Sequence, residues 1–470
     1  RLPRLWQHFM QQRRSKGEFV SIIPESILLA TGACVLNGLN EVDFVIDGVM
    51  PIQWQRTYIS DNTHSGILGR GWSLPCTLCL LYKDEDVIVV DAQGREIPFP
   101  LQEIGQSYYS KFERITLLRT GVQQWELITQ DGMRLVFGVT DTVDEAHESA
   151  QTDLATIAQD EQRVLLRSIL DSNGNEFKLR YDTTGLLELI ERSDGFRLQL
   201  AYAGRNFVGG ARLIEVRWTS GDVSKPDDPL GSLLVSYRYS SQGDLEEVFD
   251  GSGRVCQRFH YVDHQLVERV EASGLTVHYE WSEHSTSGHV VSMRHSTGMN
   301  WSFARDKATH HVRVTQDSGA LLRTVEQYFD EDGHIIRSVD AMGAVARWER
   351  DAYGNVQSFT DPEGGVTRYD YDPLGRTTMV VLPDGSQQTT KWFGTMDKPA
   401  AVTDALGRTT RFEWDERGNL LQTTGADGST TSYRYDERGL PVTIIDALGK
   451  SKHLRYNTLG QLTEYIDCSS

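Results

Sequence analysis

Cysteine and proline are scarce in this sequence, and long hydrophobic runs are missing. The 470 residues include only 5 Cys and 13 Pro. So few cysteines over this length exclude the dense disulfide framework that holds many small secreted domains together. No stretch of 18 apolar residues occurs, so we expect no membrane-spanning helix. No apolar segment of the signal-peptide type follows the first basic residues.

Positive charge is also in deficit. The chain carries 47 Lys and Arg against 66 Asp and Glu, a formal net charge of −19. A surface this acidic repels phosphate groups, which argues against nucleic acid and anionic membranes as partners. A local exception is the basic cluster within residues 1–20, which we interpret as a solvated tail.

Patterns typical of catalytic or metal sites are missing as well. Cys76 and Cys79 form a lone CxxC without a second ligand pair at zinc spacing, so we interpret them as small apolar residues. Eight of the 13 His fall between residues 260 and 311, yet none lies in an HxxxH helical context. Phosphate-binding loops and GxSxG elbows do not occur. The sequence therefore predicts no enzyme, no catalytic residue, no cofactor and no metal site.

A repeat of about 21 residues fills the C-terminal part of the chain. Its units read aromatic residue, Asp or Asn, two residues, then Gly. The position before the Asp falls at Phe329, Arg350, Tyr371, Trp392, Trp414, Tyr435 and Tyr456. A second turn signal interleaves with the first, as in Asp404–Gly407 and Asp446–Gly449. Each period therefore predicts two turns and two short strands.

The residues of each unit suit a β-hairpin. An Asp at the start of a turn accepts hydrogen bonds from backbone N–H groups ahead of it. The Gly three residues later can adopt positive φ beside a β-bulge. Flanking residues alternate as in strands. The predicted structural repeat residues are Tyr371, Asp372, Gly375, Trp414, Asp415, Gly418, Tyr435, Asp436, Gly439, Tyr456 and Gly460.

Hairpins of equal length placed side by side would form one long sheet. A single hairpin cannot bury its aromatic face alone, so neighbours must pack together. We expect the aromatic residues to align into a stacked wall and the twisted sheet to coil around an empty interior. The predicted fold class is all-β: a spiralling antiparallel β-sheet preceded by a β-rich N-terminal domain.

Changes in composition and pattern divide the chain into five parts. We predict a basic tail at 1–20 and a β-rich domain at 21–140. An acidic helical or flexible insertion follows at 141–163. Degenerate repeats occupy 164–319, and regular 21-residue repeats occupy 320–470.

Two regions of the chain, one in the repeats and one before them, together resemble the Rhs family. The run from Tyr433 to Leu440 resembles its YD repeat. The segments Met50–Ser60 and Gly66–Trp72 resemble the region that precedes the repeats in bacterial Rhs proteins. Trp54 and Trp72 would be core anchors of that region. The resemblance is strongest from about residue 320 onward and looser before it.

The resemblance implies a function. Similar Rhs proteins are polymorphic toxins of interbacterial competition, in which a hollow β-shell encloses a C-terminal toxin for export by type VI secretion or a similar route. The implied partners are a C-terminal toxin domain, which we expect to be absent from this chain, and a secretion spike or adaptor protein. The resemblance also implies production in the bacterial cytoplasm and export without a classical signal peptide.

Two other functions stay open from the sequence. YD repeats also occur in cell-surface adhesion proteins, where the outer face would bind carbohydrate or protein. A glycan-active enzyme would need two carboxylates at a fixed separation in a pocket, and the sequence contains no pattern that requires such a pair.

Overall fold

The structure is a computed structural model that describes residues 24, 26–83, 85–138, 163–204, 210–220 and 231–467. The predicted basic tail and residues 141–162 of the predicted insertion lie outside these ranges. Within them the chain is built of β-strands and two short 3-10 helices, η2 (Leu39–Glu41) and η3 (Pro75–Thr77). The all-β prediction is therefore confirmed. None of the described helices is long and apolar enough to span a bilayer.

Residues 26–74 form a small inner lobe of short strands. They are β1 (Ile27–Leu28), β2 (Ala33–Leu36), β3 (Val42–Ile46), β4 (Ile52–Gln55), β5 (Thr57–Ile59), β6 (Ser65–Gly66), β7 (Gly69–Arg70) and β8 (Trp72–Ser73). Strands β1, β2, β5 and β8 make one sheet, and β3–β4 and β6–β7 are separate hairpins.

All later strands belong to one continuous antiparallel sheet. Its first part comprises β9 (Cys79–Lys83), β10 (Asp86–Val90), β11 (Glu96–Pro100), β12 (Ser107–Ser110), β13 (Ile115–Gly121), β14 (Gln124–Thr129), β15 (Arg134–Phe137), β16 (Arg163–Leu170), β17 (Glu176–Tyr181), β18 (Leu187–Arg192), β19 (Phe196–Ala203) and β20 (Arg212–Ser220).

The middle part comprises β21 (Ser232–Tyr239), β22 (Leu245–Asp250), β23 (Val255–Val262), β24 (Gln265–Glu271), β25 (Thr276–Trp281), β26 (Val290–His295), β27 (Asn300–Asp306), β28 (His311–Asp317), β29 (Leu322–Phe329) and β30 (Ile335–Val339). The regular repeats comprise β31 (Val345–Arg350), β32 (Val356–Thr360), β33 (Val366–Tyr371), β34 (Thr377–Val381), β35 (Gln387–Trp392), β36 (Pro399–Thr403), β37 (Thr409–Trp414), β38 (Leu420–Thr424), β39 (Thr430–Tyr435), β40 (Pro441–Ile445), β41 (Ser451–Tyr456) and β42 (Leu462–Ile466).

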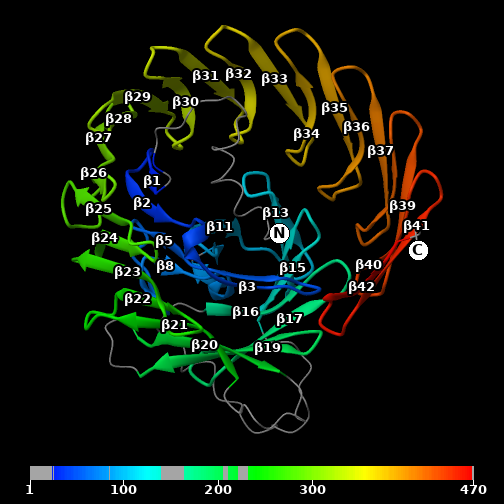
Figure 1. The fold of residues 1–470 in the computed structure, drawn as a ribbon, viewed down its shortest axis with the longest axis horizontal. Helices are drawn as coiled ribbons and strands as arrows, with labels where there is room; N and C mark the ends of the chain where they lie inside the picture. Colours follow the sequence, from blue (N-terminus) through cyan, green and yellow to red (C-terminus); the bar gives the residue numbers. More distant parts are fainter. Residues whose placement is uncertain are drawn as a thin grey trace.

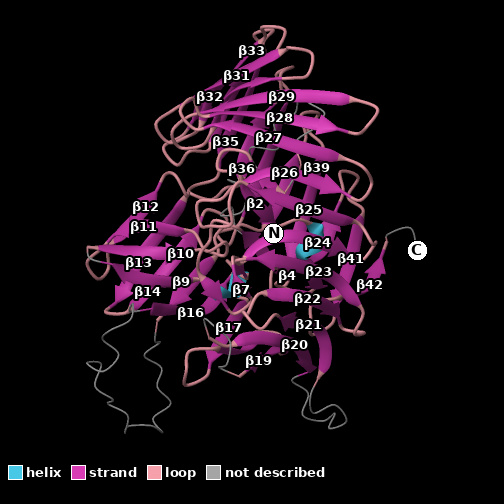
Figure 2. Cartoon of the chain, turned by 90° about the vertical axis from the view of Figure 1, so that its left-hand side faces the viewer, coloured by secondary structure: helices cyan, strands magenta, loops and turns pink. Residues whose placement is uncertain are grey.

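The sheet branches at β16. One edge of that strand pairs with β15, while the other edge is shared by β9, through Arg163–Leu165, and by β17, through Ser168–Leu170. Strands β9–β16 thereby close into a ring, which protrudes on one side in Figure 2. From β17 onward each strand pairs with the next along the chain.

The ribbon β17–β42 curls around the inner lobe. In Figure 1 it passes through green, yellow and orange until the red C-terminal strands lie beside β17, with the blue inner lobe on the concave side. The curl agrees with the predicted coiling sheet. The interior is not wholly empty, as the sequence led us to expect, because the inner lobe lies within the curl.

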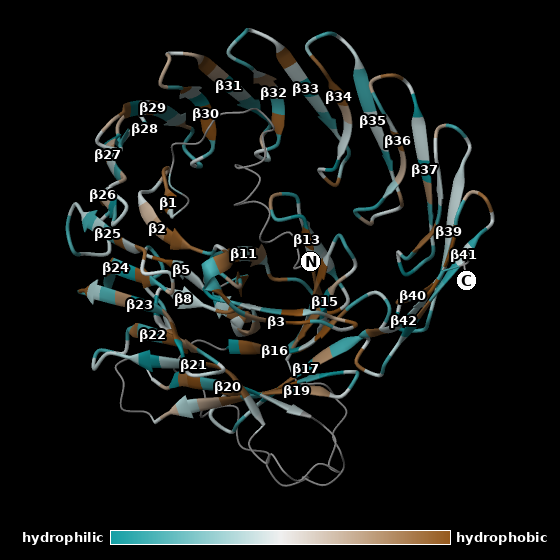
Figure 3. Cartoon of the chain, viewed as in Figure 1, coloured by the Kyte–Doolittle hydropathy of each residue, from teal (hydrophilic) through white to brown (hydrophobic). Residues whose placement is uncertain are grey.

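The hydrophobic core is concentrated where the inner lobe, the ring and the earlier repeats meet. Its buried members run from Ile27 to Phe329. Trp54 and Trp72 are both buried, at 3% and 2% exposed, in agreement with their predicted anchoring role. Figure 3 shows hydrophobic residues on β16, β17 and the strands of the inner lobe. The regular repeats β31–β42 lie largely beyond this core.

Candidate functional site: the inner face and one edge of the repeat ribbon

The Asp of each repeat organises its turn through one carboxylate oxygen. Asp436 Oδ1 accepts hydrogen bonds from the backbone N–H groups of Arg438 and Leu440, at 3.0 and 2.9 Å. Asp372 and Asp415 do the same two and four residues ahead. Each turn therefore has its N–H groups satisfied by its own first side chain.

The Gly of each turn has the positive φ that the sequence suggested. Gly375, Gly418, Gly439 and Gly460 have φ between +74° and +80°. A register shift in the strand pairing accompanies every one of these turns, at the aromatic residue that precedes the Asp. Because all these bulges lie beside the same set of turns, they increase the twist on one side of the ribbon and favour its curl.

The aromatic residue of each repeat acts as a hydrogen-bond donor. Tyr435 Oη donates to the carbonyl of Leu420 at 2.8 Å, and Trp414 Nε1 donates to that of Pro399 at 2.7 Å. Tyr371, Trp392 and Tyr456 bind the carbonyl 15 residues earlier in the same way. Tyr and Trp can therefore replace each other here, since both join a ring to a donor.

This geometry corrects one expectation. The aromatic residues of successive repeats lie two strands apart, which places them about 9–10 Å from one another. That separation exceeds the 4.5–7 Å range of ring contacts. The repeats are therefore joined by hydrogen bonds from each ring to the preceding hairpin, instead of by a continuous aromatic stack.

One face of the ribbon is aromatic and the other is charged. In β39 the half-buried Tyr433 and Tyr435 share a face, and the exposed Arg434 lies on the opposite face. We call the first of these the inner face. Its members in β33, β37, β39 and β41 are Tyr369, Tyr371, Phe412, Trp414, Tyr433, Tyr435, Leu454 and Tyr456.

The same face is fully covered in the earlier repeats. Tyr237 of β21 is 3% exposed, and its hydroxyl accepts a hydrogen bond from Trp54 Nε1 at 2.9 Å. Phe259 of β23 is 0% exposed and packs edge-on against Trp72, with ring centroids 5.1 Å apart. The inner lobe therefore occupies the concave side of β21–β24, whereas the aromatic residues on the equivalent side of β33–β42 are only half-buried by the described residues.

A buried ion pair fastens the inner lobe to this face. Arg56 Nε lies 3.0 and 2.9 Å from the two carboxylate oxygens of Asp43, and both side chains are almost fully buried. Tyr237 Oη donates to Asp43 Oδ2 at 2.6 Å, and Arg56 Nη2 donates to Gln257 at 2.6 Å. Burial raises the pKa of the Asp43 carboxyl, against the opposing pull of the Arg56 guanidinium.

The turns that follow the aromatic residues contact the ring and the first repeats. We call this row the docking edge, with turns at 351–355, 372–376, 393–398, 415–419, 436–440 and 457–461. Tyr109 Oη donates to the carbonyl of Leu374 at 2.8 Å. Asn173 and Asn419 exchange amide hydrogen bonds at 3.2 and 2.8 Å.

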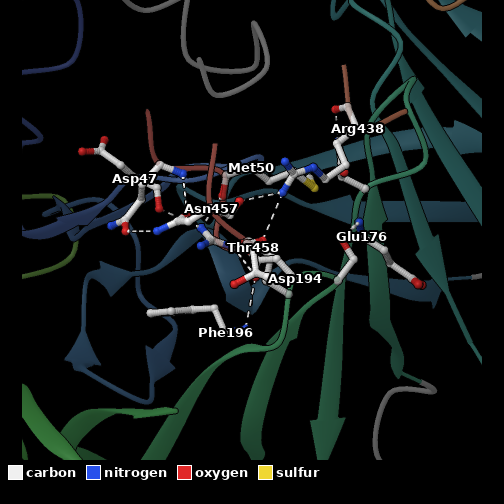
Figure 4. A network of polar contacts seen from close by, with 12 residues as sticks. Asp47, Met50, Glu176, Asp194, Phe196, Arg438, Asn457 and Thr458 are labelled. Atoms are coloured by element: carbon white, nitrogen blue, oxygen red, sulfur yellow. Dashed lines mark hydrogen bonds and ion pairs between the residues drawn. The ribbon is translucent and has the colours of Figure 1, made fainter. Parts of the chain in front are cut away.

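The last described turn of this edge meets the inner lobe near a second buried ion pair. Arg192 Nε contacts both oxygens of Asp194 at 2.9 Å and donates through Nη1 to the carbonyls of Asp47 and Met50. Arg438 Nη1 donates to the carbonyls of Asn457 and Thr458 at 3.1 Å. Figure 4 shows these groups gathered where the two ends of the ribbon come together.

One turn combines metal-binding residue types. Ligand atoms of Asp330, Asp332 and His334 lie within 4.8 Å of one another. Asp330 Oδ1 accepts the backbone N–H groups of the other two residues, and Oδ2 lies 3.3 Å from His334 Nδ1. Arg376 occupies the position of His334 in a later turn and binds Asp372 Oδ2 at 2.7 Å. The cluster therefore follows the ordinary turn geometry of the repeat.

Sequence reasoning missed the residues that join the repeat ribbon to the inner lobe and that join its late turns to its first repeats. Arg56 lies within the segment that resembles Rhs proteins, but no pattern marked it, Asp43, Asn173 or Arg192 as a coupling residue. The available signal was weak: Arg56 lies between the buried aromatic residues Trp54 and Tyr58, where a charge needs a partner.

Two family models match the chain. One is described as a domain of unknown function (DUF6531) and matches residues 24–99. The other, RHS Repeat, matches residues 350–387, 397–430 and 414–451. The first spans the inner lobe and the beginning of the ring, and the second spans the regular repeats.

Curated relatives include two bacterial toxins and a probable deoxyribonuclease. Toxin protein Tse5 of Pseudomonas aeruginosa is 31% identical over 418 residues, which cover 82% of this chain and 30% of the relative. Double-stranded DNA deaminase toxin A of Burkholderia cenocepacia is 29% identical over 302 residues, covering 64% and 19%. Probable deoxyribonuclease RhsA of Dickeya dadantii is 27% identical over 265 residues, covering 55% and 16%. The chain thus spans less than a third of each relative's length.

Several solved structures have a distant likeness to the chain. The crystal structure of TcdB2-TccC3-TEV has a TM-score of 0.36 and 12% identity, and the match covers 98% of this chain and 28% of that one. The Tc holotoxin pore of Photorhabdus luminescens has a TM-score of 0.33 and 9% identity, covering 88% and 26%.

Proposed function

The chain belongs to the Rhs family, and from that premise we propose that it forms part of a non-catalytic β-shell that encloses an effector polypeptide for export. The effector would be the C-terminal toxin domain of an Rhs polymorphic toxin. Export would proceed by type VI secretion or a similar route, with a secretion spike or adaptor protein as a further partner.

The half-buried inner face of β33–β42 carries this proposal. Tyr433 and Phe412 hold the positions that Tyr237 and Phe259 hold in the earlier repeats, yet only the earlier pair is buried beneath the inner lobe. An aromatic concave surface left half-exposed favours a polypeptide ligand. Tyr and Trp supply large contact areas at low cost in side-chain entropy, and they tolerate varied partner sequences.

A non-catalytic role fits the placement of the acidic residues. The repeat carboxylates are engaged in their own turns, as Asp372, Asp415 and Asp436 illustrate. Turn formation accounts for these acids without any substrate.

Protection from proteolysis tests the proposal. The natural protein that contains this sequence should be purified whole and digested with increasing amounts of a nonspecific protease. We expect its toxin segment to persist together with the repeats and to be digested quickly once the shell is denatured. Digestion of that segment in the intact protein at the rate of the free segment would contradict enclosure.

A glycan array addresses the adhesion alternative with the same protein. Selective binding of one carbohydrate class, abolished by substitutions on the charged outer face such as Arg434→Ala, would favour adhesion. The inner-face substitution Phe412→Ala serves as the matched control. We expect no selective binding by any of these proteins.

A further inference from the structure

The two edges of the repeat ribbon have different surroundings. At the docking edge, a Cβ added to Gly439 would meet the Asn173 amide, and one added to Gly460 would lie 2.8 Å from the Val49 nitrogen. At the opposite edge, a Cβ added to Gly428 or Gly449 would have no described heavy atom within 4 Å. Among the residues that the structure describes, only the docking edge therefore lies against another part of the molecule.

Most contacts at the docking edge are polar, although Tyr353 packs edge-on against Phe112, with ring centroids 5.7 Å apart, and Leu459 packs against the core. Arg114 Nη2 donates to Asn355 Oδ1 at 2.8 Å, the Asp397 backbone N–H donates to the Gln130 carbonyl at 2.9 Å, and Asn175 Nδ2 donates to the Arg438 carbonyl at 2.9 Å. These hydrogen bonds join turns to turns and are not part of a strand ladder. We call this line of contacts, from Asn355 to Gly460, the seam.

The other long-range attachment of the ribbon is of a different kind. Strands β21–β24 are held to the inner lobe by buried aromatic residues and by the Asp43–Arg56 pair. Separating those surfaces would expose apolar area and an ion pair that are now out of water. Separating the seam would expose mainly polar groups, which can bind water instead, and little apolar area beyond Tyr353 and Leu459, so it should cost less.

We propose that the shell opens along the seam, with β33–β42 swinging away from the ring and the first repeats while β21–β29 stay fixed to the inner lobe. The inference rests on the proposed enclosing role only for its purpose, which would be loading or release of the enclosed polypeptide. The motion itself involves only this chain. The contacts of the docking edge separate, and the paired strands β29–β33 act as the hinge.

Native-state hydrogen exchange measured by mass spectrometry tests the proposal. In the unmodified protein we expect the amides of β37–β42 to exchange together and faster than those of β21–β24. Gly439→Ala should raise exchange across β37–β42 by about tenfold or more, since regions of low stability open as units. Gly449→Ala is the matched control, because its φ of +76° is close to the +80° of Gly439 and it has no seam contact.

A second variant tests the seam without placing a strained residue in the ribbon, as Gly439→Ala does. Asn173→Ala lies in the turn after β16 and removes the Asn419 contact without altering any residue of β33–β42. It should accelerate exchange in β37–β42 as Gly439→Ala does. Joining Asn173→Cys to Asn419→Cys with a short bis-maleimide should suppress that acceleration.

Two results would overturn the seam proposal. One is exchange in β37–β42 that is no faster than in β21–β24. The other is an equal effect of Gly439→Ala and Gly449→Ala. Neither result depends on an enclosed polypeptide. A protein that protects its toxin segment from protease, but whose amides exchange equally fast in β37–β42 and β21–β24, would refute opening along the seam without contradicting enclosure.

Discussion

At the scale of single residues, the repeat depends on side chains that satisfy backbone groups. The Asp carboxylate satisfies N–H groups inside its turn, and the Tyr or Trp donor satisfies a carbonyl of the preceding hairpin. That carbonyl lies outside the register pairs between neighbouring hairpins; Thr377, for example, lies beyond the last pair of Met379 with Thr389. The aromatic residue thus links adjacent hairpins where the strand ladder has ended.

Removing one such donor should have a measurable cost. Tyr435→Phe keeps the ring but loses the hydrogen bond to Leu420, so we expect the free energy of unfolding to fall by about 1 kcal/mol. Urea denaturation would measure this loss. Tyr433→Phe, on the same strand and face, is the control and should change stability by less than about 0.5 kcal/mol. Equal effects of the two substitutions would refute a role for the donor.

Some of these single-residue roles could be predicted from the sequence. Asp436 and Gly439 carry their turn roles in their chemistry, because a short carboxylate and a residue without a Cβ suit few other positions. The donor role of Tyr435 was not predictable, since its acceptor Leu420 is 15 residues away and lies beyond the last pair of the β38–β39 ladder, that of Gln422 with Ser432. Aromatic stacking was the natural expectation and was wrong because the hairpin spacing is too wide.

At the scale of elements, three turns of the regular repeats contain a carboxyl group whose pKa is lowered. The pKa of Asp404 is held below its ordinary value of 3.8 by the Arg408 side chain and by backbone N–H groups. The pKa values of Asp384 and Asp427 are lowered by Ser386 and Ser429. A carboxyl whose pKa is lower in the folded state than in the unfolded state stabilises the fold above its unfolded pKa.

We therefore expect the regular repeats to lose stability as the pH falls below about 4, with the loss continuing through the depressed folded pKa values. Thermal melting between pH 5 and pH 2.5 would follow it. Asp404→Asn keeps an acceptor for the turn, as Asn457 does for the Gln461 N–H, but cannot titrate. Its melting temperature should depend less on pH in this range, and an unchanged dependence would contradict the assignment.

The element pattern was also largely predictable, because 21 residues with two turn signals leave room for two strands of the observed length. The sequence could not reveal that the two turns of each period face different surroundings. Both types are rich in Asp and Gly, and only the curled sheet brings Asn173 to Asn419, 246 residues away.

At the scale of the whole molecule, the inner lobe acts as the support on which the ribbon curls. Its attachment depends on the buried Asp43–Arg56 pair, so Arg56→Met should be severely destabilising. We expect a loss of about 3–5 kcal/mol, because Asp43 would remain buried without its partner. Limited proteolysis should then cut within residues 26–74 before the repeats.

The exposed Arg455→Ala is a suitable control for that experiment. Its side chain is 71% exposed and pairs with Glu464 on the surface, so its removal should cost less than about 1 kcal/mol. Adding Asp43→Leu to Arg56→Met should recover part of the stability by removing the unpaired charge. Failure of both expectations would mean that the buried pair does not hold the inner lobe.

The molecule's circumference follows from the contact between Gly460 and Val49. The loop that contains Val49 also accepts hydrogen bonds from Arg192 of β18, through the carbonyls of Asp47 and Met50. This one loop therefore contacts both an early strand of the ribbon and its last described turn. Inserting or deleting a single 21-residue unit would shift every later turn of the docking edge by one repeat. Each contact residue of the ring, the first repeats or the inner lobe would then face a different turn. Growth of such a gene by repeat duplication should therefore be tolerated after Gly460 and selected against between Arg192 and Gly460.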